Sequence, residues 1–231
     1  MIAFLLVLLG TLPSFAWAEF FTREDCHPEP KRLLVFTFLS GVIITFLVLQ
    51  FQVVINAGLI NIGLATHAPA SLLGLTFIEE VAKFFAVFLV VFRQQSFDEP
   101  IDAMIYMIVA GLGFAAVENI ALVFRTVSDP SFGSSAIDII TLRFVGATLL
   151  HALTSGIVGY YWGKAILYGR SRVIPIAGGI VVATVLHALF NHLIINFNTI
   201  FWPVLFLVVI AAFIFRDFEK FHDKQMTKKY G

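Results

Sequence analysis

Long runs of apolar residues alternate with short polar segments along almost the whole chain. A helix that crosses a bilayer needs about 20 predominantly apolar residues. Seven stretches approach or reach this length: Ile2–Trp17, Leu33–Val54, Leu72–Phe92, Ala103–Phe124, Ile139–Trp162, Val173–Ile195 and Ile200–Phe215. The segments between them are too short to form a soluble domain. The pattern therefore predicts an all-α fold, a polytopic membrane helix bundle of about seven transmembrane helices that forms one domain over residues 1–231.

The composition leads to the same class of protein. Hydrophobic residues make up 59% of the chain and charged residues 13%, against about 45–50% and 25% in soluble domains. So few charges cannot cover a water-soluble fold of this size. The composition excludes a disordered chain, a nucleic-acid-binding protein and a secreted disulfide scaffold, and it makes the lipid bilayer the expected surroundings.

The distribution of Lys and Arg predicts the orientation of the bundle. If the seven helices alternate in direction, twelve basic residues fall on one side of the membrane and Arg125 alone on the other. The twelve are Arg23, Lys31, Arg32, Arg93, Lys164, Arg170, Arg172, Arg216, Lys220, Lys224, Lys228 and Lys229. We therefore expect a multi-pass protein of the cell (inner) membrane, with the N-terminus outside. The C-terminus, with the basic tail 216–231, is then cytoplasmic.

The first apolar stretch allows a second interpretation, because Ala16-Trp17-Ala18 has the small-residue pattern of a signal-peptide cleavage site. No basic residue precedes the apolar run, however, and cleavage would break the charge alternation of the remaining helices. We therefore expect this segment to remain as the first transmembrane helix.

Several ionisable residues lie inside the predicted helices, where each costs at least ~2.5–3.5 kcal/mol to insert. They are Glu79, Glu80, Lys83, Glu118, Arg143, His151, His187 and His192. Four of them, one on each of four helices, lie about 16–22 Å from the cytoplasmic helix ends at 1.5 Å per residue. These four are Glu80, Glu118, His151 and His187. Their common depth predicts one buried polar site in the outer half of the bilayer.

Helical spacing limits how these side chains can meet. Lys83 follows Glu80 by three residues and Glu79 by four, so it can pair with either carboxylate. The two glutamates diverge by about 100° around the helix. We expect one of them to serve chemistry and the other to be held by Lys83, and the spacing does not distinguish them. His187 and Asn191 are four residues apart and share a helix face.

The glycines of two predicted helices indicate close packing around the site. Gly111 and Gly113 precede Glu118 in the fourth helix, and Gly156 and Gly159 follow His151 in the fifth. Small residues let transmembrane helix backbones approach closely. We therefore expect these two helices to pack tightly against their neighbours at the depth of the site.

Carboxylates, imidazoles and an amide in a dry layer suit three classes of function. The first is hydrolysis, with a glutamate as general base or a metal that activates water. The second is ion or proton transport, which uses the same residue types as relays. The third is a structural polar core of a binding or assembly protein. The chain contains no HExxH helix, which excludes a conventional zincin.

Four short motifs, each on its own predicted helix, follow one another between Thr76 and Asn191. They are EExxK at Glu79–Lys83, FxxxE at Phe114–Glu118, His151 preceded by Arg143, and HxxxN at His187–Asn191. In this order they resemble the PrsW family of intramembrane proteases. That family is related to the CAAX prenyl endopeptidase and abortive-infection superfamily, whose members carry FxxxH where this chain has FxxxE. The difference argues against prenyl-protein substrates.

The resemblance implies hydrolysis of a peptide bond in a membrane-embedded protein, which in the type case is an anti-sigma factor cut at an extracytoplasmic site. The catalytic core would span about 72–195. The implied catalytic residues are Glu79, Glu80, Glu118, His151, His187 and Asn191, with Lys83 and Arg143 in support. Glu79 or Glu80 would activate water, and His187 with Asn191 would polarise the scissile carbonyl.

Two forms of this chemistry stay open at the sequence level. In one, zinc or another divalent metal is bound by a set of four residues: Glu80, Glu118, His151 and His187. In the other, glutamate alone activates the water. The alternatives to a protease are an ion or small-solute transporter and a superfamily member without peptidase activity. No pattern in the chain predicts the oligomeric state.

Overall fold

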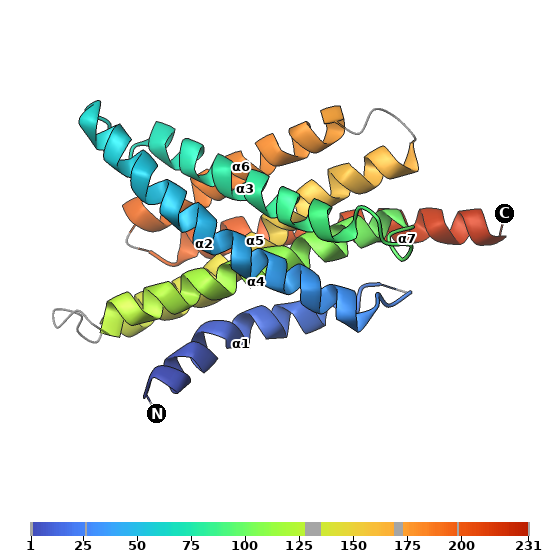
Figure 1. Ribbon diagram of the computed structural model, residues 1–231, viewed down its shortest axis with the longest axis horizontal. Coiled ribbons are helices and arrows are strands. Elements are labelled where there is room, and N and C mark those ends of the chain that lie inside the picture. The colour runs from blue at the N-terminus through green and yellow to red at the C-terminus, as the bar shows by residue number, and fades with distance from the viewer. Residues whose placement is uncertain (1, 26, 128–134, 169–172, 198, 231) are drawn as a thin grey trace.

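In the part of the chain that it describes, the computed structural model is a bundle of seven α-helices (Figure 1). It describes residues 2–25, 27–127, 135–168, 173–197 and 199–230, and no strand occurs among them. The helices are α1 (Ile2–Thr22), α2 (Lys31–Asn61), α3 (Pro69–Val91), α4 (Pro100–Val127), α5 (Ser135–Leu167), α6 (Val173–Asn196) and α7 (Phe201–Tyr230). The all-α prediction is confirmed.

Most of the helices extend a few residues beyond the apolar stretches that predicted them, and α2 and α7 extend furthest at their C-terminal ends. α2 has 31 residues and continues to Asn61, and α7 has 30 residues and continues to Tyr230. The predicted basic tail is therefore a continuation of the last helix. Its Glu, Lys, Gln and Met residues are good helix formers, so the helix does not end where the apolar run ends.

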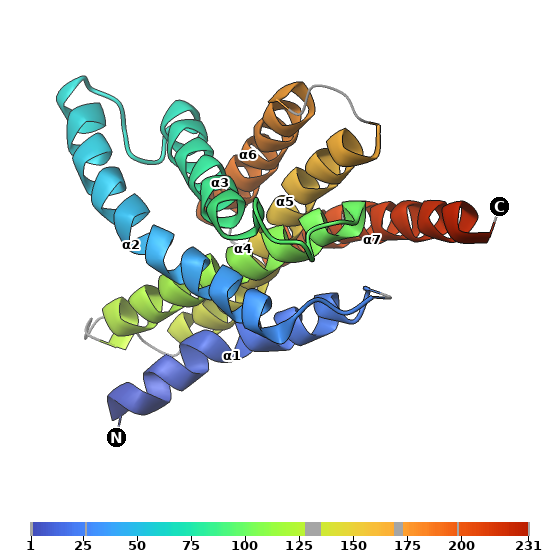
Figure 2. The same ribbon diagram turned by 45° about the vertical axis from the view of Figure 1, so that its right-hand side comes forward.

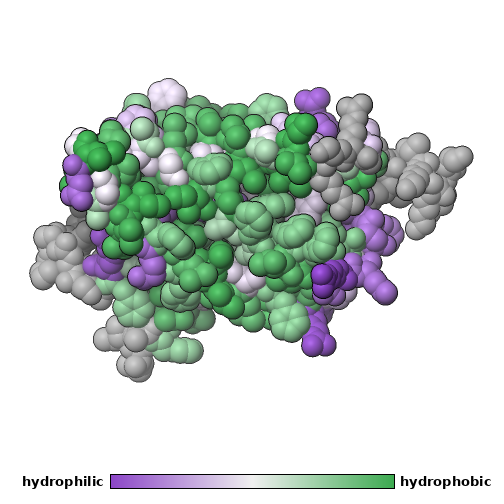
Figure 3. Space-filling view, turned by 45° about the horizontal axis from the view of Figure 1, so that its top comes forward, coloured by the Kyte–Doolittle hydropathy of each residue, from purple (hydrophilic) through white to green (hydrophobic). Residues whose placement is uncertain are grey.

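The surface of the bundle matches a protein embedded in lipid. Within the described residues, four helical segments are long and apolar enough to cross a membrane: Lys31–Asn61, Pro100–Arg125, Val173–Asn196 and Phe201–Phe221. α3 is also long enough to cross a membrane, but it carries three charged residues near its middle, Glu79, Glu80 and Lys83. These residues belong to the polar site described below. Large apolar side chains such as Leu89 (79% exposed) and Ile174 (77%) cover the outside. Figure 3 shows this apolar surface with the hydrophilic residues gathered toward its two ends.

α4 lies at the centre of the bundle, and its residues from Ile101 to Val117 are nearly all buried. It packs against α1, α2, α3, α5 and α7, most extensively against α5. α4 and α5 form a central pair, and α3 and α6 lie side by side on one side of it (Figure 2). The polar site lies where α3 and α6 meet the central pair.

Glycines allow the close approach of α4 to its neighbours, as the sequence predicted. A Cβ atom on Gly113 would collide with the carbonyl of Phe38 in α2. A Cβ atom on Gly111 would collide with Ser155 and lie 2.8 Å from the carbonyl oxygen of His151 in α5. This tight packing fixes the height of His151 relative to α4.

Candidate active site

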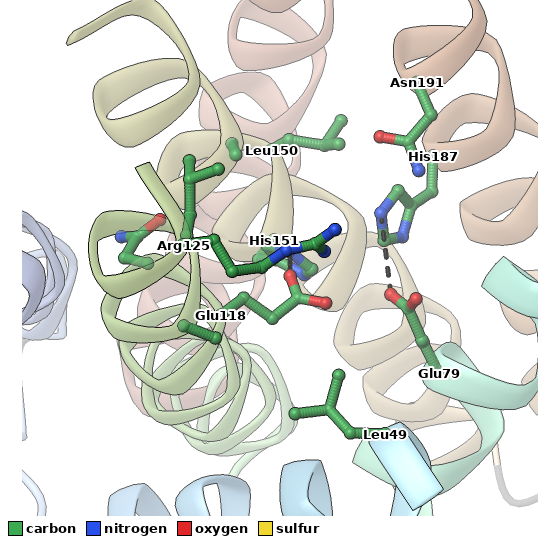
Figure 4. A pocket seen from close by; sticks show the side chains of 12 residues that line it. Leu49, Glu79, Glu118, Arg125, Leu150, His151, His187 and Asn191 are labelled. Atoms are coloured by element: carbon green, nitrogen blue, oxygen red, sulfur yellow. Dashed lines mark hydrogen bonds and ion pairs between the residues drawn. The ribbon is translucent and has the colours of Figure 1, made fainter. Parts of the chain in front are cut away.

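A cavity of about 230 Å³ lies between α2, α3, α4, α5 and α6. Its polar lining residues are Glu79, Glu118, Asn119, Arg125, His151, His187 and Asn191, and its apolar ones include Leu49 and Leu150. Figure 4 shows Glu79 and His187 on one side of this cavity and Glu118 with His151 on the other. Five of the six catalytic residues predicted from the sequence therefore line one cavity.

The sixth, Glu80, lies behind the cavity and is fully buried. Its Oε1 atom accepts hydrogen bonds from Lys83 Nζ at 2.8 Å, His187 Nδ1 at 2.8 Å and Thr154 Oγ1 at 3.3 Å. Lys83 is also fully buried, and its Nζ lies 4.7 Å from the centre of the Phe114 ring. A buried ion pair is tolerated when further hydrogen bonds and contacts of this kind surround it.

Glu79 faces the cavity. Its Oε1 atom accepts a hydrogen bond from Gln52 Nε2 of α2 at 2.6 Å. Its Oε2 atom is buried, has no hydrogen-bond partner among the described residues, and lies 3.6 Å from His187 Nε2. The two consecutive glutamates thus approach opposite edges of the same imidazole ring. This geometry distinguishes two carboxylates that spacing alone did not.

Glu118 and His151 form the other wall of the cavity. Lys83 Nζ donates to His151 Nδ1 at 2.8 Å, so the proton of a neutral His151 ring is on Nε2, which lies 2.7 Å from Glu118 Oε2. The His151 and His187 rings lie 4.8 Å apart and nearly perpendicular. A continuous series of polar contacts therefore joins Glu118, His151, Lys83, Glu80 and His187 across four helices.

Three of these residues offer a set of metal ligands. One ligand atom each from Glu79, His151 and His187 lies within 4.8 Å of the other two, and all three residues are buried. One carboxylate with two imidazoles is a common donor set of catalytic zinc sites. Oε2 of each glutamate is buried without a hydrogen-bond partner among the described residues, but only Glu79 lines the cavity, so its Oε2 atom fits this use. Glu80, which the sequence placed among the ligands, has its Oε1 atom engaged by Lys83 and His187 instead.

The remaining candidates differ in position. Asn191 lines the cavity one turn after His187. His192 points away from it and lies 3.1 Å from the Asn196 amide. Arg143 belongs to α5, and its side chain is outside the described part of the chain.

Sequence reasoning missed four polar residues that contact the site or line it: Gln52, Asn119, Arg125 and Thr154. Gln52 is a polar residue within a predicted transmembrane helix, but an uncharged side chain there costs too little to indicate a site by itself. Thr154 lies one turn after His151, but threonine is common in membrane helices and gave no signal. Arg125 was noticed only as the exception to the charge bias.

The four sequence motifs that contain these residues agree with a comparison against known protein families. The model of the PrsW family intramembrane metalloproteases matches residues 29–216. The chain belongs to this family. The match begins just before α2 and ends within α7, so it contains every residue of the site described above.

Individual members of the PrsW family show the same similarity. The chain is 28% identical over 194 residues to protease PrsW of Geobacillus kaustophilus, covering 83% of this chain and 80% of the relative. It is 27% identical to protease PrsW of Bacillus subtilis, with 97% and 99% covered. With protease PrsW of Oceanobacillus iheyensis the identity is 25%, with 88% and 90% covered. No solved structure matches the chain.

Family membership decides between the functions that the sequence chemistry left open. The protein is an intramembrane peptidase of the metalloprotease class, and the transporter alternative is not supported. Its substrate is accordingly a protein in or at the membrane. The family description also agrees with the donor set of Glu79, His151 and His187.

Proposed function

We propose that this PrsW-family protease cleaves a membrane-anchored, anti-sigma-factor-like protein, with Glu79 as the carboxylate at the reaction centre. The observation that carries this assignment is the division between the two glutamates. Glu79 lines the cavity and directs an unpartnered oxygen toward His187 Nε2, whereas Glu80 lies behind the ring and accepts from Nδ1. Only the first is placed to meet a substrate.

Glu79, His151 and His187 are the residues that would hold a divalent metal, for which we propose zinc. Such an ion supplies Lewis-acid chemistry, polarising a carbonyl and lowering the pKa of water. Glu80 would orient His187 by accepting a hydrogen bond from its Nδ1–H group, the arrangement commonly found behind histidine ligands. Because Lys83 donates to His151 Nδ1, the proton of the neutral ring is on Nε2; for Nε2 to serve as a ligand, that proton would have to leave and Nδ1 would have to take one from Lys83, which would then accept the hydrogen bond as a neutral amine.

Glu118 is our candidate for the general acid–base group. It lines the cavity, is less buried than the other carboxylates and lies 2.7 Å from His151 Nε2. It can take a proton from the attacking water and return it to the leaving amine. Asn191 lines the same cavity, and its amide would donate a hydrogen bond to the carbonyl oxygen as negative charge develops there.

The assignment is tested by cleavage of a single-span reporter protein in proteoliposomes, together with metal analysis of each purified variant. Glu79→Gln should lose both bound metal and cleavage. Glu80→Gln should keep a weaker site, with activity reduced about 10–100-fold, as for other partners of metal ligands. His192→Ala, on the same helix as His187, is the matched control and should behave as wild type. Full cleavage by Glu79→Gln would refute the assignment.

We further propose that the protein lies in the inner cell membrane with its basic side in the cytoplasm. The support is the distribution of twelve basic residues against Arg125 alone. Under this orientation the reaction centre lies in the outer half of the bilayer, at the level of Glu118 in the outer part of α4 and of His151 at the middle of α5. A reporter fused between α5 and α6 should be active only as a cytoplasmic protein, and activity of a periplasmic reporter there would overturn the orientation.

A further inference from the structure

Arg125 is the basic residue that the charge pattern does not explain, and it lines the catalytic cavity. It lies seven residues after Glu118 in α4. Together with Ala121 and Leu122 it continues the same helix face, at the spacing that forms one wall. Among the described residues of the lining it is the one Lys or Arg. The exception to the charge bias is thus part of the site.

The side chain of Arg125 is directed into the cavity rather than away from it. Figure 4 shows it extending across the cavity, with the guanidinium over the space between Glu118 and His187. The residue is solvent-exposed and forms no ion pair with another described residue. An arginine that merely reached for the membrane surface would point along the helix axis to the nearer end of the bundle. Arg125 instead presents its donors to whatever occupies the cavity.

We propose that Arg125 selects substrates by binding an acidic side chain close to the scissile bond. This inference rests on the proposed function of the cavity. A guanidinium offers a planar set of donors that matches a carboxylate and binds it in bidentate fashion. The apolar lining residues around it, such as Leu122 and Leu150, exclude water and favour such a pair over two separately hydrated charges.

The geometry also limits where in the substrate the acidic residue lies. Seven residues of α-helix place the Cα atoms of Glu118 and Arg125 about 10 Å apart along the axis. Helical side chains lean toward the N-terminus, so the guanidinium returns toward the level of Glu118, leaving about 5–10 Å. An extended peptide covers ~3.3 Å per residue. The selected Asp or Glu therefore lies about one to three positions from the scissile bond.

The experiment uses a single-span reporter whose cut position is mapped by mass spectrometry, with Asp or Asn placed in turn at the three positions on either side. Wild type in neutral-lipid proteoliposomes should show kcat/KM about tenfold higher for Asp than for Asn at one of these positions. Arg125→Gln should bring that ratio close to one, and Arg125→Glu should reverse it in favour of Asn, because the new carboxylate would repel Asp. Arg93→Gln, a basic residue beyond the other end of the site, is the matched control and should keep the ratio.

Three outcomes would overturn the inference. One is an Asp-to-Asn ratio near one at every position in wild type. Another is a fall in kcat for all reporters alike in Arg125→Gln, which would make Arg125 a group that acts on the reacting atoms. The third is an activity that depends on both Arg125 and anionic lipid but is equal for the Asp and Asn reporters, which would assign Arg125 to a lipid phosphate.

A binding measurement separates this inference from the proposed function. The labelled Asp and Asn peptides are bound to the Glu79→Gln variant in neutral-lipid nanodiscs, where no turnover is needed. If no reporter is cleaved, the proposed function fails, but an Asp preference that depends on Arg125 would still support the inference. Equal binding of the two peptides would refute it.

Discussion

Replacing Lys83 with methionine should destabilise the protein strongly, because the change leaves Glu80 buried without its ammonium partner. Both side chains are fully buried, and Lys83 Nζ lies 2.8 Å from both Glu80 Oε1 and His151 Nδ1. Removing one partner of a buried pair costs about 3–5 kcal/mol. At ~2–4 °C per kcal/mol for a chain of this size, the thermal midpoint should fall by about 6–20 °C.

A double-mutant cycle distinguishes loss of the charge pair from loss of packing. Lys83→Met, Glu80→Gln and the double variant would be compared by thermal unfolding in detergent. The double variant should be more stable than Lys83→Met alone by about 2–3 kcal/mol, because a neutral amide needs no counter-charge. Destabilisations that simply add would refute the reasoning, since they would show that the two side chains do not depend on each other.

Lys220 provides a matched control in the same chain. It pairs with Asp217 three residues earlier, as Lys83 does with Glu80, but its side chain is 44% exposed. An exposed pair contributes about 0–1 kcal/mol. Lys220→Met should therefore change the thermal midpoint by no more than a few degrees. A loss as large as that of Lys83→Met would mean that burial is not what makes the inner pair important.

Three further changes test other parts of the molecule. Gln52→Leu should reduce turnover about 10–100-fold with little change in stability, because it removes the 2.6 Å hydrogen bond that positions Glu79. Gly111→Ala should lower the free energy of unfolding by about 1–3 kcal/mol and should also lower activity, since the new methyl group would collide with Ser155. Burial raises the pKa of the Asp25 carboxyl, which lies in the α1–α2 connection. A raised folded-state pKa favours the protonated form, so this stabilisation is present at low pH and lost as pH rises. Asp25→Asn should thus gain stability relative to wild type as pH rises above about 4, the ordinary pKa of an aspartate.

Each of these changes has a control or a contradicting result. Gln50→Leu removes an exposed amide from the same helix and should leave turnover unchanged. Gly74→Ala adds a methyl group where no atom lies within 4 Å, so it should not destabilise α3. Equal effects of the two leucine or the two alanine variants would contradict the structural reasons given. For Asp25, pH profiles of wild type and variant that run parallel would do so.

The depth of the site was predictable from the sequence, whereas the direction of its side chains was not. Helical rise alone brought Glu80, Glu118, His151 and His187 to one layer, and the structure places them in contact. The rotation of α3 about its own axis depends on how it packs against α6 and the central helices. Periodicity does not report that rotation, so it could not tell which glutamate faces the cavity.

Neutral partners were harder to predict than charged ones, for a physical reason. A charge at membrane depth is costly enough to draw attention wherever it occurs. A glutamine or threonine costs less, so its presence in a helix does not by itself indicate a site. Gln52 and Thr154 gain their meaning only from Glu79 and Glu80, the carboxylates they contact.

The two consecutive glutamates contact opposite edges of the His187 ring, which a single carboxylate could not do. His187 has two ring nitrogens on opposite edges, and Glu80 fixes the tautomer by accepting from Nδ1, which leaves Nε2 directed at Glu79. Because the two carboxylates share one helix, the residue that orients the imidazole and the residue that faces the cavity move together. Lys83, on the next turn, ties the same helix to His151. A displacement of α3 relative to α5 and α6 would therefore disturb both histidines at once, which explains why the charged residues of α3 are placed in its most buried segment.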